Sequence, residues 1–245
     1  MTAMVGTVLR VPRGCRLPVL CCAVLTVAAL IGGCARVVAG TARAGDPQVR
    51  PARPIPVAEL LIEPRRFPAQ YPAAVLPPKD VDRVLGEIDG VALGSEVTPP
   101  ECAPLPVLTD QRAAAEGTDE EGARLIVTVV RPVSSVRARV AQLAECPSFT
   151  STAGGEAGEV SKVTVDLPPA PPVDADDSYA VNQTVTAKSS DGRDTTTLTL
   201  VALVDDVRVT ASWQQDGSSN ASPDTQALDT LFTDAVLKVR QEIPR

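Results

Sequence analysis

The feature that most constrains this chain is the segment 30–34, with the sequence LIGGC, which ends an apolar run at residues 17–30. Three arginines and no acidic side chain precede the run within residues 1–16. A basic start, a short apolar segment and small residues before a cysteine predict a bacterial lipoprotein signal. We therefore expect residues 1–33 to be a signal peptide and Cys34 to become the lipid-modified first residue.

An uncleaved membrane helix is the alternative for the same run. Its helical residues would span only about 21 Å, which is short of the roughly 30 Å hydrocarbon core of a bilayer. Acyl chains on Cys34 would hold the protein at the membrane without crossing it, and several chains anchor stably where one does not. The predicted location is the extracytoplasmic face of the cell membrane, with Met1 or Met4 as the start of translation.

The remaining chain divides by composition into a tether and one domain. Residues 34–56 are rich in proline, alanine and arginine and are predicted to form a flexible tether. Its arginines either contact an anionic leaflet or stay solvated, and both alternatives stay open. Residues 57–245 are expected to form a single α+β domain, because this length suits one hydrophobic core.

Charge and composition exclude several classes of function. From residue 57 the chain has 16 basic and 29 acidic side chains, a net charge of −13. Such a surface repels phosphate backbones, so no nucleic acid partner is expected. The chain has no histidine, which excludes Ser-His-Asp and Cys-His catalysis and most zinc sites.

Two cysteines remain in the domain once the signal and Cys34 are set aside, namely Cys102 and Cys146. A lone pair outside any metal-binding pattern in an extracytoplasmic protein most often forms a disulfide. Free structural thiols and a redox or catalytic role are the alternatives. A bridge closing a loop of about 45 residues would restrict the unfolded chain by roughly 4 kcal/mol.

Hydrophobic periodicity predicts mixed elements in the first half of the domain. Residues 57–78 are rich in proline and are expected to be extended over the surface, with their aromatic side chains as plugs. An amphipathic helix is predicted at 79–88. Strands at 111–117 and 123–131 are joined by an acidic turn. Ser134 or Ser135 is expected to cap a following helix that ends at the second domain cysteine.

The second half alternates in the manner of strands and ends in a helix. Strands are predicted at 160–167, 179–188, 195–204 and 207–214, and a turn at 189–192. Ser222 is expected to cap a carboxy-terminal helix, whose apolar side chains recur on one face. The expected fold is α+β: an antiparallel sheet of five or six strands packed against helices as a two-layer sandwich, with one disulfide.

Three groups of carboxylates, at 119–121, 174–177 and 205–206, are the candidates for catalytic or metal chemistry. All three lie at predicted turns, where acidic side chains are usually solvated. Weak binding of divalent ions and a glycosidase pair are the alternatives, since glycosidases use two carboxylates. We therefore predict no catalytic residue, no cofactor site and no metal site, and we expect the chain not to be an enzyme.

Several motifs together resemble mycobacterial envelope lipoproteins: the LIGGC segment, the tether of arginine and proline, PPKDV at 77–81, PPEC at 99–102 and a cysteine at a helix end. Residues 57–243 more loosely resemble the extracellular sensor domain of the mycobacterial kinase PknH. That resemblance implies an α+β sandwich with a cleft for a small ligand and no catalysis. The sensor domain has two bridges, whereas this chain keeps a single cysteine pair.

Two non-catalytic functions are consistent with these observations, and a glycan hydrolase is the third alternative. The first is a binding or sensor-like lipoprotein of the cell envelope, which holds a small apolar or amphipathic ligand or contacts an envelope protein. The second is a structural or antigenic surface lipoprotein without a ligand. An apolar pocket with a few convergent polar groups would favour the first, and two carboxylates facing across a cleft would favour the hydrolase.

Overall fold

The structure is a computed structural model that describes residues 55–107, 110–133, 135–154, 158–188, 194–217 and 222–243. Residues from Arg53 onward belong to one compact unit. Cys34, the predicted signal peptide and all but the end of the predicted tether lie outside the described residues, so the anchor stays a prediction. Among the described residues, no helix is both long enough and apolar enough to cross a bilayer.

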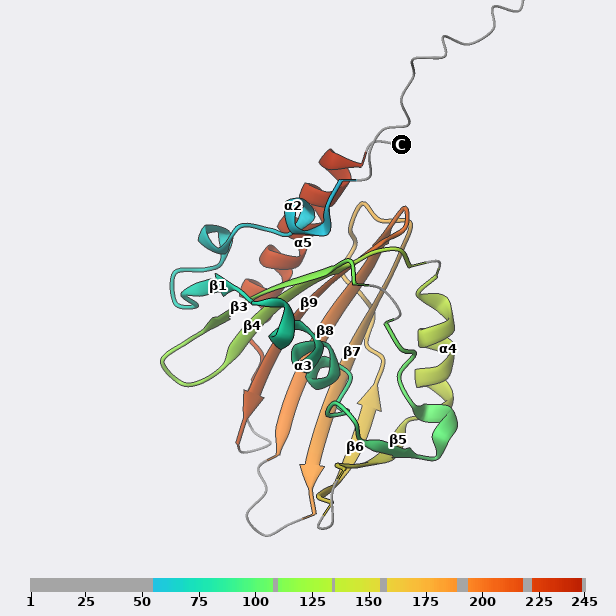
Figure 1. Cartoon of the computed structure of the whole chain (residues 1–245). Helices are drawn as coiled ribbons and strands as arrows, with labels where there is room; N and C mark the ends of the chain where they lie inside the picture. Colours follow the sequence, from blue (N-terminus) through green and yellow to red (C-terminus); the bar gives the residue numbers. More distant parts are fainter. Residues whose placement is uncertain are drawn as a thin grey trace, which may run out of the picture. The chain divides into compact units, whose positions relative to one another are not determined.

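A single antiparallel sheet of nine strands forms the centre of the unit (Figure 1). Its strand order is β1-β3-β4-β9-β8-β7-β6-β5-β2. The strands are β1 (Ala73–Val75), β2 (Glu96–Thr98), β3 (Arg112–Thr118), β4 (Arg124–Val130), β5 (Ser148–Thr152), β6 (Val160–Asp166), β7 (Asp177–Ala187), β8 (Thr195–Val204) and β9 (Val207–Asp216). The two edge strands are the shortest, which limits the unpaired backbone available for aggregation.

Helices lie against both faces of this sheet. They are α2 (Val57–Leu60), α3 (Pro78–Ile88), α4 (Arg137–Glu145) and α5 (Thr225–Glu242), with short 3-10 helices η1 (Pro64–Arg66) and η2 (Pro100–Cys102). In Figure 1, α5 and α2 are seen on the opposite side of the sheet from α3. The arrangement therefore has three layers, with the sheet in the middle.

The main hydrophobic core lies between the sheet and α5. Trp213 of β9 and Phe232 of α5 are its largest fully buried side chains. Alternate residues of β4, β8 and β9 face this helix, because successive strand side chains point to opposite faces. The segment around α2 completes the core, and Leu60, Phe67 and Tyr71 are all buried in it. The prediction that these two aromatics act as plugs is confirmed.

Smaller apolar clusters hold α3 and α4 to the other face. Val81 and Leu85 of α3 pack against Ala114 and Val130, which belong to β3 and β4. Leu143 of α4 belongs to a separate cluster with Phe149, Val163 and Val181. The sheet therefore buries both of its faces, which explains why it supports helices on each side.

The α+β class, the antiparallel sheet, and the disulfide between Cys102 and Cys146 are confirmed. The expected five or six strands are too few, and helices on both faces replace the expected two layers. Strands β1, β2 and β5 were missed because β1 has only three residues, all apolar, and β2 and β5 have one apolar residue each, so that no alternation can be seen. Residues 57–78 include helical turns and buried side chains instead of running only extended over the surface.

The helix caps also differ from expectation. Asp224, not Ser222, caps α5, and its carboxylate accepts a hydrogen bond from the Ala227 amide at 3.0 Å. The helix dipole also favours a negatively charged carboxylate at this amino-terminal position. At α4 the N-cap residue is Val136, not Ser135, although the Ser135 hydroxyl accepts a hydrogen bond from the Arg137 amide at 3.1 Å. Ser134 and the predicted turn at 189–192 lie outside the described residues.

Candidate ligand-binding cavity

The face of the sheet beneath α3 and α4 is unusually polar for a buried surface. Cross-strand register places rows of polar side chains side by side, such as Thr128 beside Thr210 and Gln183 beside Thr197. The buried polar side chains of this face are Thr128, Ser151, Gln183, Thr197, Thr199, Thr210, Ser212 and Gln214. Buried polar groups cost free energy unless they are hydrogen-bonded, so this face, and not the apolar face under α5, is the candidate for a site.

Ion pairs fix α3 over this face. Arg124 of β4 contacts Glu87 at 3.0 Å, and Glu87 also contacts Arg83 at 2.7 Å within the helix. Arg112 of β3 contacts Asp82 at 2.8 Å. These pairs lie at the partly exposed edge of the helix, where each contributes little alone but orients the helix as a group. The carboxy-terminal end of α3 is thereby held above the centre of the sheet.

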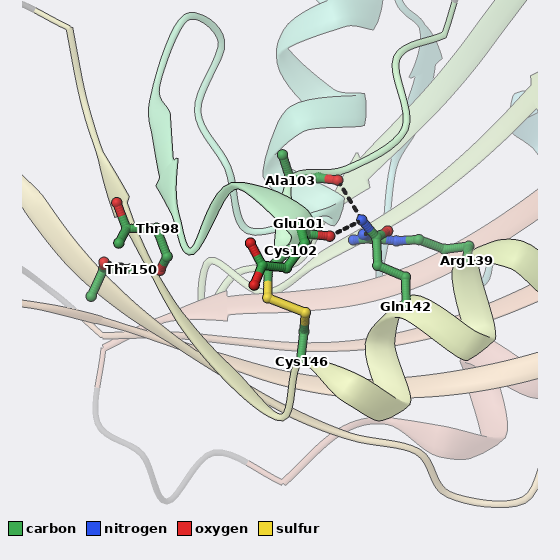
Figure 2. The surroundings of a disulfide bond; sticks show 8 residues. All are labelled: Thr98, Glu101, Cys102, Ala103, Arg139, Gln142, Cys146 and Thr150. Carbon is green, nitrogen blue, oxygen red and sulfur yellow. Dashed lines mark hydrogen bonds between the residues drawn. A yellow bond between two sulfur atoms is a disulfide. The ribbon is translucent and has the colours of Figure 1, made fainter.

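The disulfide and one glutamine fix α4. Cys102 in η2 is bonded to Cys146, the residue that follows α4 (Figure 2). The Gln142 side-chain nitrogen donates to the carbonyl oxygens of Glu101 at 2.6 Å and Ala103 at 2.7 Å, on either side of Cys102. The segment that contains η2 is therefore attached to α4 by one covalent bond and two hydrogen bonds.

Between the two helices and the sheet lies a cavity with two adjoining chambers. The inner chamber has a volume of about 30 Å³, and the outer chamber about 410 Å³. Four side chains line both chambers: Asp89, Arg139, Tyr179 and Arg208. We call these four residues the polar boundary. They come from the end of α3, from α4, from β7 and from β9, so the boundary exists only once the fold has formed.

The walls of the outer chamber combine apolar side chains with the polar boundary, in nearly equal shares of surface. Apart from the polar boundary, they are formed by Leu105, Pro106, Val107, Val130, Pro132, Val133, Ser135 and Val136. Leu105 is 55% exposed and lies in the wall of this chamber. A volume of several hundred cubic ångströms with apolar walls and few polar groups is typical of small-molecule sites.

The charges of the polar boundary are only partly balanced. Arg139 is 9% exposed and donates to Asp89 Oδ1 at 3.0 Å and to Gln142 Oε1 at 2.7 Å. Arg208 has a buried Nε atom with no hydrogen-bond partner in the described part of the chain. One guanidinium is therefore neutralised by a carboxylate, while the other keeps an unused donor.

Unused hydrogen-bonding capacity continues into the inner chamber. Gln183 is 2% exposed and Thr128 is fully buried, yet Gln183 Nε2 and Thr128 Oγ1 have no partner among the described residues. A Cβ atom at Gly90 would lie 2.2 Å from Gln183 Nε2, and Gly90 has a φ of +70°. A glycine is required here by both space and backbone conformation, so α3 can end close against the sheet.

Tyr179 of the polar boundary is expected to keep its proton far into the alkaline range. Burial raises its pKa to about 12, and the nearby Asp89 carboxylate adds to this, whereas Arg208 and Arg139 oppose it. A raised pKa in the folded state stabilises the fold below pH 10, and this stabilisation is lost as pH rises towards 12.

Phenolate absorbance in a Tyr71→Phe variant would check this expectation, because Tyr179 is then the only tyrosine in the chain. The titration should show a midpoint near pH 12 in the folded protein and near pH 10 after denaturation. A folded-state midpoint close to 10 would contradict the burial of the phenol.

The three groups of carboxylates singled out in the sequence do not converge on this cavity. The Asp119 carboxylate accepts hydrogen bonds from the backbone amides of Glu121 and Ala123, as in a tight turn. Asp176 contacts Arg240 at 3.2 Å, and Asp206 contacts Arg131 at 2.8 Å. These acids have structural partners, which corrects the view that they are simply solvated.

Sequence reasoning missed the polar boundary, although one signal for it is visible in the sequence. In β9 the polar residues Arg208, Thr210, Ser212 and Gln214 alternate with Val207, Val209, Ala211 and Trp213. Such alternation is also the ordinary pattern of a strand with one solvated face, so it does not by itself mark a site. Thr210, Ser212 and Gln214 are instead buried and Arg208 is half-buried, and that burial follows only from the helices above them.

A comparison with protein families identifies the group to which this sequence belongs. A family model described as domain of unknown function (DUF5642) matches residues 58–240. The chain belongs to the DUF5642 family. The match spans all nine strands and all the residues of the polar boundary, so the cavity lies within the DUF5642 domain.

The comparisons with curated proteins and with solved structures show no further relationship beyond this family. No curated protein matches the chain. Among solved structures, it is similar to the X-ray structure of an uncharacterized protein of Mycobacterium smegmatis described as an Rv0999 ortholog. The sequence identity is 17%, the match covers 72% of this chain and 92% of the other, and the TM-score is 0.40. A TM-score this low does not establish a shared fold.

Proposed function

We propose that this DUF5642 protein is a non-catalytic binding module of the cell envelope, which holds a small amphipathic molecule in its cavity. The observation that supports the proposal best is the outer chamber, where apolar side chains lead to the four side chains of the polar boundary. An apolar chain would fit its walls, and a polar end would meet the polar boundary. The resemblance to mycobacterial envelope lipoproteins and to the PknH sensor domain agrees with this proposal.

Native mass spectrometry of the full chain, purified from its own host in mild detergent, would test the proposal. We expect a non-covalent mass in addition to that of the lipidated protein. Val107→Trp would place a large ring in the wall of the outer chamber, and this variant should lose the additional mass. Val75→Trp is the matched control, because Val75 is 56% exposed on β1 and lines no part of the cavity.

Two results would overturn the proposal. The first is repeated purification of the full chain without any additional mass. The second is a mass that persists unchanged in Val107→Trp, since the molecule would then lie elsewhere. The first result would favour the structural or antigenic surface protein, in which the domain carries no ligand, and the second would favour a binding site outside the cavity.

The proposed location has a separate test in Cys34→Ala. This variant removes the sulfur that would carry the acyl chains, so the protein should leave the membrane fraction almost completely. Several acyl chains provide stable anchoring that apolar protein surface does not replace. Fractionation of wild type and variant by ultracentrifugation would measure the effect, and Cys22→Ala, within the predicted signal peptide, is the control that should stay with the membrane. An unchanged distribution of Cys34→Ala would show that the lipid anchor is absent.

A further inference from the structure

We propose that the cavity selects molecules with a singly charged anionic head group, a carboxylate, which binds at Arg208 while an apolar tail lies in the outer chamber. This inference rests on the proposed function and adds the chemical class of the ligand. It follows from the charges at the polar boundary, from the volumes of the two chambers and from the unused donors around them.

The polar boundary has a net charge of +1. Arg139 and Asp89 neutralise each other at 3.0 Å, and the Tyr179 phenol is uncharged at neutral pH. Arg208 therefore remains as the unbalanced cation. The nearest carboxylates in the sequence and across the strands already have partners, because Asp206 contacts Arg131 and Asp177 contacts Arg137 at 2.9 Å.

This positive charge is unexpected in its surroundings. The domain from residue 57 has a net charge of −13, so an arginine would easily find an acidic partner if only stability mattered. A partly buried guanidinium without a partner loses hydration without gaining a hydrogen bond. Arg208 is thus a cation with a donor that no described residue satisfies, and its side chain lines both chambers, where a bound anion would meet the guanidinium.

The chamber volumes place the head group at the polar boundary. The inner chamber, with about 30 Å³, has room for only about one or two water molecules. Such water would satisfy Gln183 Nε2 and Thr128 Oγ1, which have no partner among the described residues. The ligand therefore fills the outer chamber, and its charged end stops where the two chambers meet.

The charge at the boundary favours a carboxylate over a doubly charged phosphate monoester. A guanidinium matches the planar carboxylate with two parallel hydrogen bonds. The second negative charge of a phosphate monoester would find no free cation at the polar boundary, because Arg139 is already paired with the Asp89 carboxylate. It would also be repelled by that carboxylate at short range.

Competition with a photoactivatable fatty acid would test this inference on the full lipoprotein in nanodiscs. Decanoate, decanol and decylamine would compete for labelling of the peptides that line the outer chamber. We expect decanoate to displace the label at about a tenfold lower concentration than decanol, because a hydrogen bond to a charged group is lost in the alcohol. Decylamine should be the weakest competitor.

Arg208→Gln identifies the residue responsible. This variant should weaken displacement by decanoate about tenfold and leave displacement by decanol unchanged. Arg66→Gln is the matched control, because the Arg66 side chain is 54% exposed, pairs with Asp234 on α5 and does not line the cavity. It should leave both competitors unchanged, whereas a loss equal to that in Arg208→Gln would reduce the effect to general surface charge and contradict the proposal.

The outcomes separate this inference from the proposed function. If no competitor displaces the label in the wild type, the cavity binds no amphiphile and the proposed function fails. If decanoate and decanol compete equally, or decylamine competes best, the cavity binds amphiphiles but the carboxylate inference fails. The wild-type comparison decides even if Arg208→Gln does not fold, which circular dichroism would reveal.

Discussion

Phe232→Ala should lower the free energy of unfolding by about 3–5 kcal/mol, among the largest effects of any single substitution in this chain. Phe232 is fully buried between α5 and the sheet, in the same cluster as Trp213. Truncating the ring removes the transfer free energy of its atoms and leaves a cavity. The surrounding strands are fixed by their neighbours in the sheet and cannot close over it.

Urea unfolding followed by the fluorescence of Trp213, the only tryptophan in the chain, would measure the loss. Leu237→Ala is the matched control, because Leu237 lies on the same helix and is 43% exposed. It should cost no more than about 1 kcal/mol. Equal losses in the two variants would mean that α5 does not pack against the sheet through Phe232.

Replacing both Cys102 and Cys146 by alanine should have an effect of similar size. The bridge closes a loop with a sequence separation of 44 residues. In the chain-entropy model this loop restricts the unfolded state by roughly 4 kcal/mol, although measured effects range from about 2 to 5 kcal/mol. The double substitution leaves no unpaired thiol in the domain, and comparison with the reduced wild type, which keeps both buried sulfur atoms, separates the effect of the bridge from that of lost packing.

The same variant should also weaken binding in the cavity. Gln142 is hydrogen-bonded on both sides of Cys102 and receives a hydrogen bond from Arg139, so the bridge orients one residue of the polar boundary. Chemical unfolding with and without a reducing agent would measure the stability, and the reducing agent should affect only the wild type. A wild type whose stability does not change on reduction would show that the bridge does not constrain the unfolded chain.

The sequence was sufficient where an element carries its own repeating pattern. The hairpin of β8 and β9 was predicted at 195–204 and 207–214, and the structure has Thr195–Val204 and Val207–Asp216. Helix α3 was predicted to within one residue, because Pro78 starts it and apolar residues recur at helical spacing. Such elements are determined by local propensities that the fold does not override.

The cavity could not be predicted in the same way, because it depends on contacts between distant segments. Asp89, Arg139, Tyr179 and Arg208 belong to four elements and are brought together only by strand pairing and helix packing. The edge strands were not predicted for the same reason: β2, for example, pairs with the distant β5 and has a single apolar residue. Neither the register of such short strands nor the burial of a polar face is encoded locally.

The two faces of the sheet pack against different parts of the domain, so the residues on each face can change independently within the family. Side chains that face α5 form the main hydrophobic core, while those that face α3 and α4 include the lining of the cavity. Because neighbouring strand residues point in opposite directions, selection can act on Arg208 while leaving Val207 and Val209 untouched. Substitutions that change the lining of the cavity can therefore accumulate on this scaffold while the side chains of the main core stay the same.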